Sequence, residues 1–178
     1  MINLDYNSIY ERLVRLDEDA GLLFDTDTRY QIIVVGGSSL VLQRLGKTAT
    51  QDIDSIDVSK ELSPLLEKYD INTYAEAYIN NFPYNYEDRL ILLFEGNNVN
   101  VYVMSLEDVV ISKLCASRPP DIIDITAPDV IAHLNWDILH HLATDEYEAK
   151  ASALNDRNYN IFKDAYYDYV KEYKPCDS

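Results

Sequence analysis

The spacing of apolar positions predicts both helix and strand in the first part of the chain. Ile9, Leu13 and Leu16 recur at helical spacing and predict a helix over residues 5–19. Residues 31–35 form a short, continuous and β-branched apolar run, which is typical of a central strand buried on both faces. Together the two patterns indicate a chain of mixed α/β type.

Capping and turn residues predict the elements that follow this strand. Ser38 is predicted to open a short helix that runs to about residue 45, and a turn follows at 46–48. A strand is predicted over 52–58. Ser59 is predicted to cap a helix that runs to residue 68, and a partly helical stretch follows at about 73–80. Two further strands, over 89–94 and 99–104, flank the turn Glu-Gly-Asn-Asn and predict a β-hairpin.

The second half of the chain is predicted to be helical. Ser105 begins a capping-box-like sequence for a helix that runs to residue 116 and stops before two prolines. A short turn of helix is expected over 121–125, and Thr126 is expected to cap a helix to about residue 142. Packing explains the stripe of the last helix more simply than an aromatic ligand platform does. That stripe consists of Tyr159, Phe162, Tyr166, Tyr169 and Tyr173.

These elements predict one domain that spans residues 1–178. Its core, over about 30–125, is a small mixed β-sheet flanked by helices, and helices over about 126–174 form the C-terminal part. A hydrophobic content of 47% supplies enough apolar material for such a core.

The composition of the chain narrows its partners and its location. The formal net charge of −16 argues against bulk binding to nucleic acid, because basic residues must neutralise phosphates there. An acidic surface fits a basic protein partner and also serves solubility alone, so both explanations remain open. The N-terminus shows no secretory pattern, no apolar run approaches the ~18 residues of a membrane span, and two cysteines are too few for a disulfide framework. We therefore expect a cytoplasmic protein without a membrane segment.

A Gly-Gly-Ser-Ser sequence at 36–39 follows the predicted central strand. A glycine turn between a buried strand and a helix presents backbone N–H groups, and together with the helix N-terminus it can bind an anion. Glycine permits close approach and positive φ, while Ser38 and Ser39 add hydroxyl donors. The alternative is a turn in which the glycines serve geometry alone.

Two aspartates on the next predicted strand supply a second candidate feature. Asp52 and Asp54 flank Ile53, so in a strand the two carboxylates share one face while the isoleucine points to the core. Adjacent carboxylates repel unless they are solvated, protonated or bridged by a divalent cation, and Mg²⁺ favours one or two carboxylates together with substrate phosphates. The alternative is a solvated acidic strand end.

The two features together resemble the signature of the nucleotidyltransferase superfamily, a Gly-Ser pair followed after a spacer by two acids separated by one residue. Here Gly37-Ser38 and Asp52 enclose thirteen residues, and Thr50 begins the T-x-D-I-D form that is common in this superfamily. The resemblance implies a nucleotidyltransferase fold with nucleotide phosphates held by Gly36, Gly37, Ser38 and Ser39, and with Mg²⁺ held by Asp52 and Asp54.

A second segment, SLEDVVISKLCASRPPDIID at 105–124, resembles AbiEii-like toxin nucleotidyltransferases and related nucleotidyltransferase-like families of unknown function. The matching positions are Glu107, Asp108, Lys113, Leu114, Arg118, Asp121 and Asp124. The resemblance implies that Lys113 contacts the triphosphate, that Arg118 helps to bind the nucleotide and that Asp121 orients or deprotonates the acceptor. It further implies transfer of a nucleotidyl group from a nucleoside triphosphate, in a bacterial toxin–antitoxin or defence context.

Lys113 is also unusual without the resemblance. On a helical wheel it falls near the middle of the apolar face, beside Val109. Burial of an ammonium without a partner costs several kcal/mol, so an anionic partner is expected. An internal aspartate and a bound phosphate are the two alternatives for that partner. Arg118, Asp121 and Asp124 likewise form either a functional group or a salt-bridged helix end.

One part of the superfamily pattern is missing from the chain. Catalytic members usually add a third carboxylate on a neighbouring strand, and the matching strand here, 98–104, offers Asn98, Asn100 and Tyr102 on that face. Three functions therefore stay open. They are an active Mg²⁺-dependent nucleotidyltransferase, a degenerate module of the same fold that binds a nucleotide or a protein without turnover, and a plain interaction domain.

Overall fold

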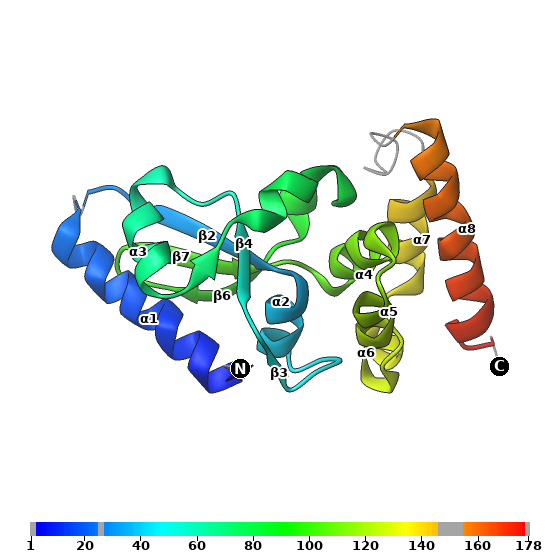
Figure 1. The fold of residues 1–178 in the computed structure, drawn as a ribbon, viewed down its shortest axis with the longest axis horizontal. Coiled ribbons are helices and arrows are strands. Elements are labelled where there is room, and N and C mark those ends of the chain that lie inside the picture. The colour runs from blue at the N-terminus through cyan, green and yellow to red at the C-terminus, as the bar shows by residue number, and fades with distance from the viewer. Residues whose placement is uncertain (1–2, 25–26, 146–154, 177–178) are drawn as a thin grey trace. The chain divides into compact units, whose positions relative to one another are not determined.

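The computed structural model describes residues 3–24, 27–145 and 155–176 (Figure 1). Contacts among them divide the chain into two compact units. The first unit takes the described residues of 1–77 and 90–104, and the second takes those of 78–89 and 105–178. The single domain predicted over residues 1–178 stays a prediction.

The first unit contains a five-stranded mixed sheet with the strand order β5-β4-β2-β7-β6. Its central strand β2, Tyr30–Val35, pairs antiparallel with β4 and parallel with β7. The other strands of this sheet are β4, Ile53–Ile56; β5, Ile71–Asn72; β6, Ile91–Glu95; and β7, Val99–Val103. A separate two-stranded ribbon pairs β1, Leu4–Asp5, with β3, Ala49–Thr50.

Helices cover one face of this sheet (Figure 1). They are α1, Tyr6–Leu23; α2, Gly36–Gln43; and α3, Ser63–Lys68, which follows the 3₁₀ helix η1, Lys60–Leu62. Leu13 and Leu16 of α1 are fully buried and share one hydrophobic cluster with Ile32 and Val34 of β2. The predicted first helix, the buried central strand and the α/β class with a small mixed sheet are thus confirmed.

A buried acid fixes the hairpin formed by β6 and β7. Asp17 of α1 is 6% exposed, and its carboxylate accepts hydrogen bonds from the N–H groups of Asn97, Asn98 and Val99 over 2.7–3.0 Å. A Cβ at Gly96 would lie 2.4 Å from Asp17 Oδ1, so the turn has no room for a larger residue. The predicted hairpin is confirmed. The carboxylate that holds its turn lies at least 80 residues earlier in the chain.

Three predicted boundaries in the first unit are wrong in detail. Helix α2 begins at Gly36 and not at Ser38, so the glycines belong to its first turn. Ser59 does not cap a helix with its side chain, because its Oγ accepts a hydrogen bond from Gln31 N at 3.2 Å. The strand predicted over 52–58 is confined to β4 because its two ends leave the sheet pairing.

The described part of the second unit is helical. Its α-helices are α4, Leu106–Ala116; α5, Pro119–Ile125; α6, Pro128–His133; α7, Trp136–Thr144; and α8, Asp156–Tyr173. The 3₁₀ helices η2, Tyr74–Asn81, and η3, Tyr86–Arg89, lie along the chain between β5 and β6.

Helix α4 has the predicted bounds, and the Ser105 hydroxyl accepts a hydrogen bond from Asp108 N at 3.2 Å. No helix in the described ranges is both long and apolar enough to span a bilayer.

The helix predicted from Thr126 to about residue 142 is wrong, because two helices take its place. Helix α6 ends at His133, and α7 begins after Asn135. The Asn135 side chain accepts hydrogen bonds from the N–H groups of Asp137 and Ile138, so it starts a new helix at this point. Thr126 does not cap α6, since its hydroxyl donates to the carbonyl of Ile122 at 2.9 Å.

The aromatic stripe of α8 packs inside the second unit. Phe162, Tyr166 and Tyr169 are at most 4% exposed. The Tyr169 hydroxyl donates to the Ile125 carbonyl at 2.7 Å, and the Tyr166 hydroxyl lies 2.9 Å from His140 Nδ1. Burial with satisfied hydroxyls confirms the packing interpretation of the stripe.

Candidate functional site

The Gly-Gly sequence forms the corner where β2 ends and α2 begins. Gly36 has a φ of +61°, in the left-handed region that favours glycine. Val35 pairs with Asp54 in the register of β2 and β4, which brings the second half of the motif to the same corner. We call Gly36, Gly37, Ser38 and Asp54 the glycine–aspartate corner.

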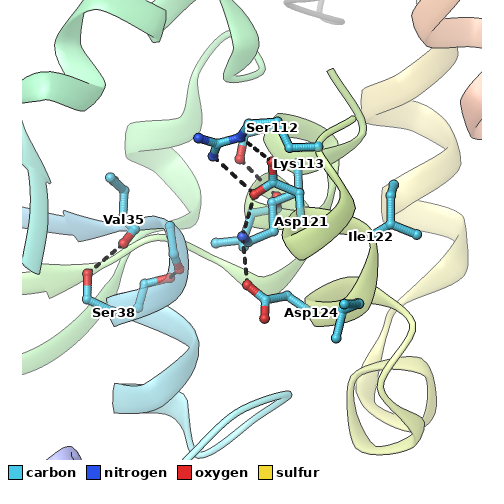
Figure 2. A network of polar contacts seen from close by, with 12 residues as sticks. Val35, Ser38, Ser112, Lys113, Asp121, Ile122 and Asp124 are labelled. Carbon is cyan, nitrogen blue, oxygen red and sulfur yellow. Dashed lines mark hydrogen bonds and ion pairs between the residues drawn. The ribbon is translucent and has the colours of Figure 1, made fainter. Parts of the chain in front are cut away.

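Ser38 connects the two sides of the corner. It is completely buried, and its hydroxyl donates to the Val35 carbonyl at 2.8 Å (Figure 2) and accepts from Asp54 N at 3.2 Å. Ser39 is also buried, and its hydroxyl donates to the Gly36 carbonyl at 3.2 Å. Both hydroxyls therefore stabilise the backbone of the corner. The assignment of the two serines to nucleotide binding stays a prediction.

The two predicted metal ligands lie at the start of β4. Asp54 is half-buried on the strand, and Asp52 is exposed one residue before the strand begins. Ile53 between them is fully buried in the core, as the alternation predicted. A Cβ at Gly36 would lie 3.3 Å from Asp54 Oδ2, so the glycine leaves room for this carboxylate beside the start of α2.

Lys47 and Thr50 lie at the same corner, although the sequence predicts only a turn for Lys47. A Cβ at Gly37 would lie 3.2 Å from Lys47 Nζ and 3.3 Å from Thr50 Oγ1. Lys47 is half-buried and Thr50 is 8% exposed. The signal available in the sequence was the place of this lysine, inside the spacer between the glycines and the aspartates.

Strand β7 brings no third acid to the corner. Asn100 pairs with Gln31 of β2, and Gln31 lies four residues before Val35. Four residues span about 13 Å along a strand, so Asn100 is remote from the corner, and Asn98 lies farther still. Glu95 of β6 pairs with Asn100 and is equally remote. Asn98, Asn100 and Glu95 therefore supply no third carboxylate at the corner.

Asp52 and Asp54 carry the type of group that Mg²⁺ binds in proteins. Residues 3–24, 27–145 and 155–176 contain no group of three or more His, Cys, Asp or Glu that could hold a metal ion. Asp52 and Asp54 supply two carboxylates, and Mg²⁺ is often held by one or two carboxylates together with substrate phosphates and water. The chemistry of the two carboxylates is compatible with a magnesium–nucleotide complex, and the assignment of Mg²⁺ to Asp52 and Asp54 stays a prediction.

In the second unit, Lys113 lies in a group of charges that we call the lysine cluster, formed with Arg118, Asp121 and Asp124 (Figure 2). Lys113 Nζ lies 2.9 Å from Asp121 Oδ1 and 2.9 Å from Asp124 Oδ2. The three side chains are only 8%, 4% and 9% exposed. Arg118, which is 71% exposed, places Nε 2.7 Å from Asp121 Oδ2. Two cations thus balance two carboxylates.

The expected anionic partner of Lys113 is confirmed, and it is a pair of internal aspartates. Burial raises the pKa of Asp121, but hydrogen bonds from Arg118 and Lys113 outweigh it and hold that pKa below its ordinary value of 3.8. The carboxylate is therefore ionised at neutral pH. The cluster has the form of a salt-bridged helix end, and the roles of its residues toward a nucleotide or an acceptor stay predictions.

The other acids of this segment hold the second unit together. Asp108 is fully buried and accepts hydrogen bonds from Arg89 Nε at 2.9 Å and Arg89 Nη2 at 2.8 Å. The Ser105 hydroxyl donates to Asp108 Oδ2 at 2.6 Å. Glu107 Oε1 accepts from Asn135 N at 2.8 Å, next to the start of α7. These two motif positions therefore fix neighbouring elements of the unit.

Comparison with protein families now adds to this geometry. A family described as nucleotidyltransferase of unknown function (DUF6036) matches residues 11–174. The chain belongs to this nucleotidyltransferase family. Its membership confirms the predicted resemblance to nucleotidyltransferase-like families of unknown function, and the match spans both motif segments. Comparisons with curated proteins and with solved structures found no match for this nucleotidyltransferase-family chain.

Proposed function

We propose that the protein transfers a nucleotidyl group from a nucleoside triphosphate to an acceptor in a Mg²⁺-dependent reaction. The observation that best supports the proposal is the glycine–aspartate corner, where Asp54 meets the start of α2 in a chain of a nucleotidyltransferase family. The start of a helix favours phosphate, and paired carboxylates favour the metal. The two halves of a magnesium–nucleotide complex thus each have a matching group.

The proposed reaction is an in-line displacement at the α-phosphorus. The acceptor nucleophile forms a bond to this phosphorus and gives up its proton, while the bond to the bridging oxygen breaks and pyrophosphate leaves with the electron pair. Mg²⁺ held by Asp52 and Asp54 would neutralise phosphate charge and align the reacting groups. Backbone N–H groups of Gly36 and Gly37 bind the leaving phosphates, and the Ser38 hydroxyl keeps Asp54 in place.

The roles proposed in the second unit rest on the sequence resemblance. Lys113 and Arg118 are assigned to the nucleotide, and Asp121 is assigned to the acceptor. A carboxylate with a lowered pKa is a weak base. We therefore assign Asp121 to orientation of the acceptor and leave the proton to water or to the acceptor itself.

A module that binds nucleotides without turnover is the second candidate. It is favoured by the pairing of β7, which leaves Asn100 and Asn98 remote from the corner and offers no third carboxylate there. A site with two acids can hold a magnesium–nucleotide complex, but a second metal ion to activate the acceptor has fewer ligands.

The proposed cellular setting rests on the sequence resemblance and on the net charge. The resemblance to AbiEii-like toxins suggests a bacterial toxin–antitoxin or defence context, and the net charge of −16 suggests a basic protein partner. A cytoplasmic location agrees with both and with the nucleoside triphosphate that the reaction consumes.

The test combines binding and transfer on the full chain. The protein is incubated with ATP, GTP, CTP or UTP carrying an α-phosphate label, in Mg²⁺ or in EDTA, with total RNA and a protein extract as acceptors. Magnesium-dependent binding is measured by calorimetry and label transfer on denaturing gels. We expect binding of at least one nucleotide, and loss of transfer in Asp54→Asn. Glu61→Gln, which changes an exposed acid of η1 in the first unit, is the matched control for Asp54.

Each outcome separates the candidates. Transfer that Glu61→Gln keeps and Asp54→Asn loses supports the enzyme. Magnesium-dependent binding without any transfer supports the binding module. Absence of nucleotide binding by the unchanged chain would overturn both.

A further inference from the structure

We propose that Lys47, which lies beside the glycine–aspartate corner, binds the triphosphate of the nucleotide. This inference rests on the proposed function and names a residue that the sequence resemblance did not assign. Lys47 lies in the loop after α2, and its Nζ is 3.2 Å from the position that a Cβ at Gly37 would occupy. It is therefore the ammonium group at the first turn of this helix.

The two glycines face opposite charges. At position 36 an added Cβ would meet Asp54 Oδ2 at 3.3 Å, and at position 37 it would meet Lys47 Nζ at 3.2 Å. A magnesium–triphosphate complex needs the same division, because carboxylates bind the metal and a cation neutralises phosphate oxygens. The absence of side chains at both positions leaves room for a charged group on each side of the helix start.

The fold delivers Lys47 to this place through backbone contacts. Arg44 ends α2 in the left-handed conformation, and Leu45 N donates to the Leu40 carbonyl at 3.0 Å. Lys47 N then donates to the Leu45 carbonyl at 2.8 Å, which turns the chain back along the helix. Pairing of Thr50 with Leu4 fixes the far end of the loop. The lysine is thus held on a short loop anchored at both ends.

Position distinguishes Lys47 from two other cations. The Lys113 ammonium lies in the lysine cluster, 2.9 Å from each of two carboxylates. The Arg44 guanidinium stacks over the Tyr6 ring at 4.4 Å. Lys47 is the lysine whose ammonium lies at the glycine turn, where the proposed function places the phosphates.

The experiment compares ligands that differ in phosphate content. Lys47→Met and Lys47→Arg are measured beside Lys60→Met, which changes an exposed lysine of η1 in the same unit. The probes are inorganic tripolyphosphate and the four nucleoside triphosphates and monophosphates, all with Mg²⁺, measured by calorimetry. We expect Lys47→Met to weaken tripolyphosphate and triphosphate binding by about tenfold or more. Monophosphate binding should change less than about threefold, and Lys47→Arg should retain most of the affinity.

The alternatives have distinct results. If the unchanged chain binds no nucleotide or tripolyphosphate, the proposed function fails and this inference with it. If the unchanged chain binds triphosphates and Lys47→Met binds them as well as Lys60→Met does, the inference alone is overturned. An equal loss for monophosphates and triphosphates, or a lowered urea midpoint in Lys47→Met alone, would show a structural role and would also overturn it.

Discussion

The glycine–aspartate corner, with Lys47 beside it, and the lysine cluster each contain an aspartate and a lysine, but they differ in exposure. In the cluster, Lys113 and its two aspartates are at most 9% exposed, and every charge has an opposite charge beside it. At the corner, Asp54 and Lys47 are half-buried and lie beside glycines that carry no side chain. The first arrangement is almost closed to solvent, and the second is partly open to it.

This difference in burial predicts how much each substitution costs the fold. Removal of one partner of a buried ion pair leaves an uncompensated charge in a region of low dielectric constant. A half-buried carboxylate keeps contact with solvent, so its loss is expected to cost the fold less. Substitutions in the two regions should therefore separate stability from ligand affinity.

The largest expected effect is the loss of stability in Lys113→Met. This change leaves Asp121 and Asp124 buried without the ammonium, and removal of one partner from such a pair typically costs about 3–5 kcal/mol. The free energy of unfolding is measured in urea. Lys171→Met, an exposed lysine of α8, is the control and should stay within about 0.5 kcal/mol of the unchanged chain.

A further variant tests the cause of that loss. If charge imbalance is responsible, adding Asp121→Asn and Asp124→Asn to Lys113→Met should restore part of the stability. A triple variant as unstable as the sum of its single changes would contradict the contrast between the two regions.

An intermediate effect is expected at Ser38, where the corner is built. Ser38→Ala removes the bonds to the Val35 carbonyl and from Asp54 N in a fully buried position, which should cost about 1–3 kcal/mol. It should also weaken magnesium-dependent nucleotide binding, because Asp54 loses its anchor. Ser39→Ala, which removes one bond within the helix, is the matched control and should cost less than about 1 kcal/mol. Equal losses in the two variants would argue against the anchoring role of Ser38.

The smallest effect is expected in how the free energy of unfolding depends on acidic pH. Because the pKa of Asp121 is lowered on folding, its contribution is fully present above the ordinary value of 3.8 and is lost as pH falls through the folded pKa. The free energy of unfolding of the unchanged chain should fall with decreasing pH below about 4. In Asp121→Asn this part of the slope should be absent. An identical slope in both proteins would show that Asp121 is not held ionised by the cluster.

Much of the local structure followed from the sequence. Apolar spacing predicted α1 and β2, turn residues predicted the β6–β7 hairpin, and Ser105 marked the start of α4. These features depend on periodicity and on hydrogen bonds that span a few residues, so the order of residues largely fixes them. Local signals failed where a nearby residue competed, as Asn135 did when it divided the helix predicted from Thr126.

By itself, the sequence determined that a glycine turn and two aspartates share one spacer, and that a lysine on an apolar helix face needs an anion. Only the tertiary structure decided that the anion is Asp121 with Asp124, that the Ser38 hydroxyl points inward, and that Lys47 returns to Gly37. The physical reason is the separation along the chain between the residues that interact. A helix or a cap is decided within one or two turns of chain, whereas the partner of a charge depends on strand register and on how separate elements pack.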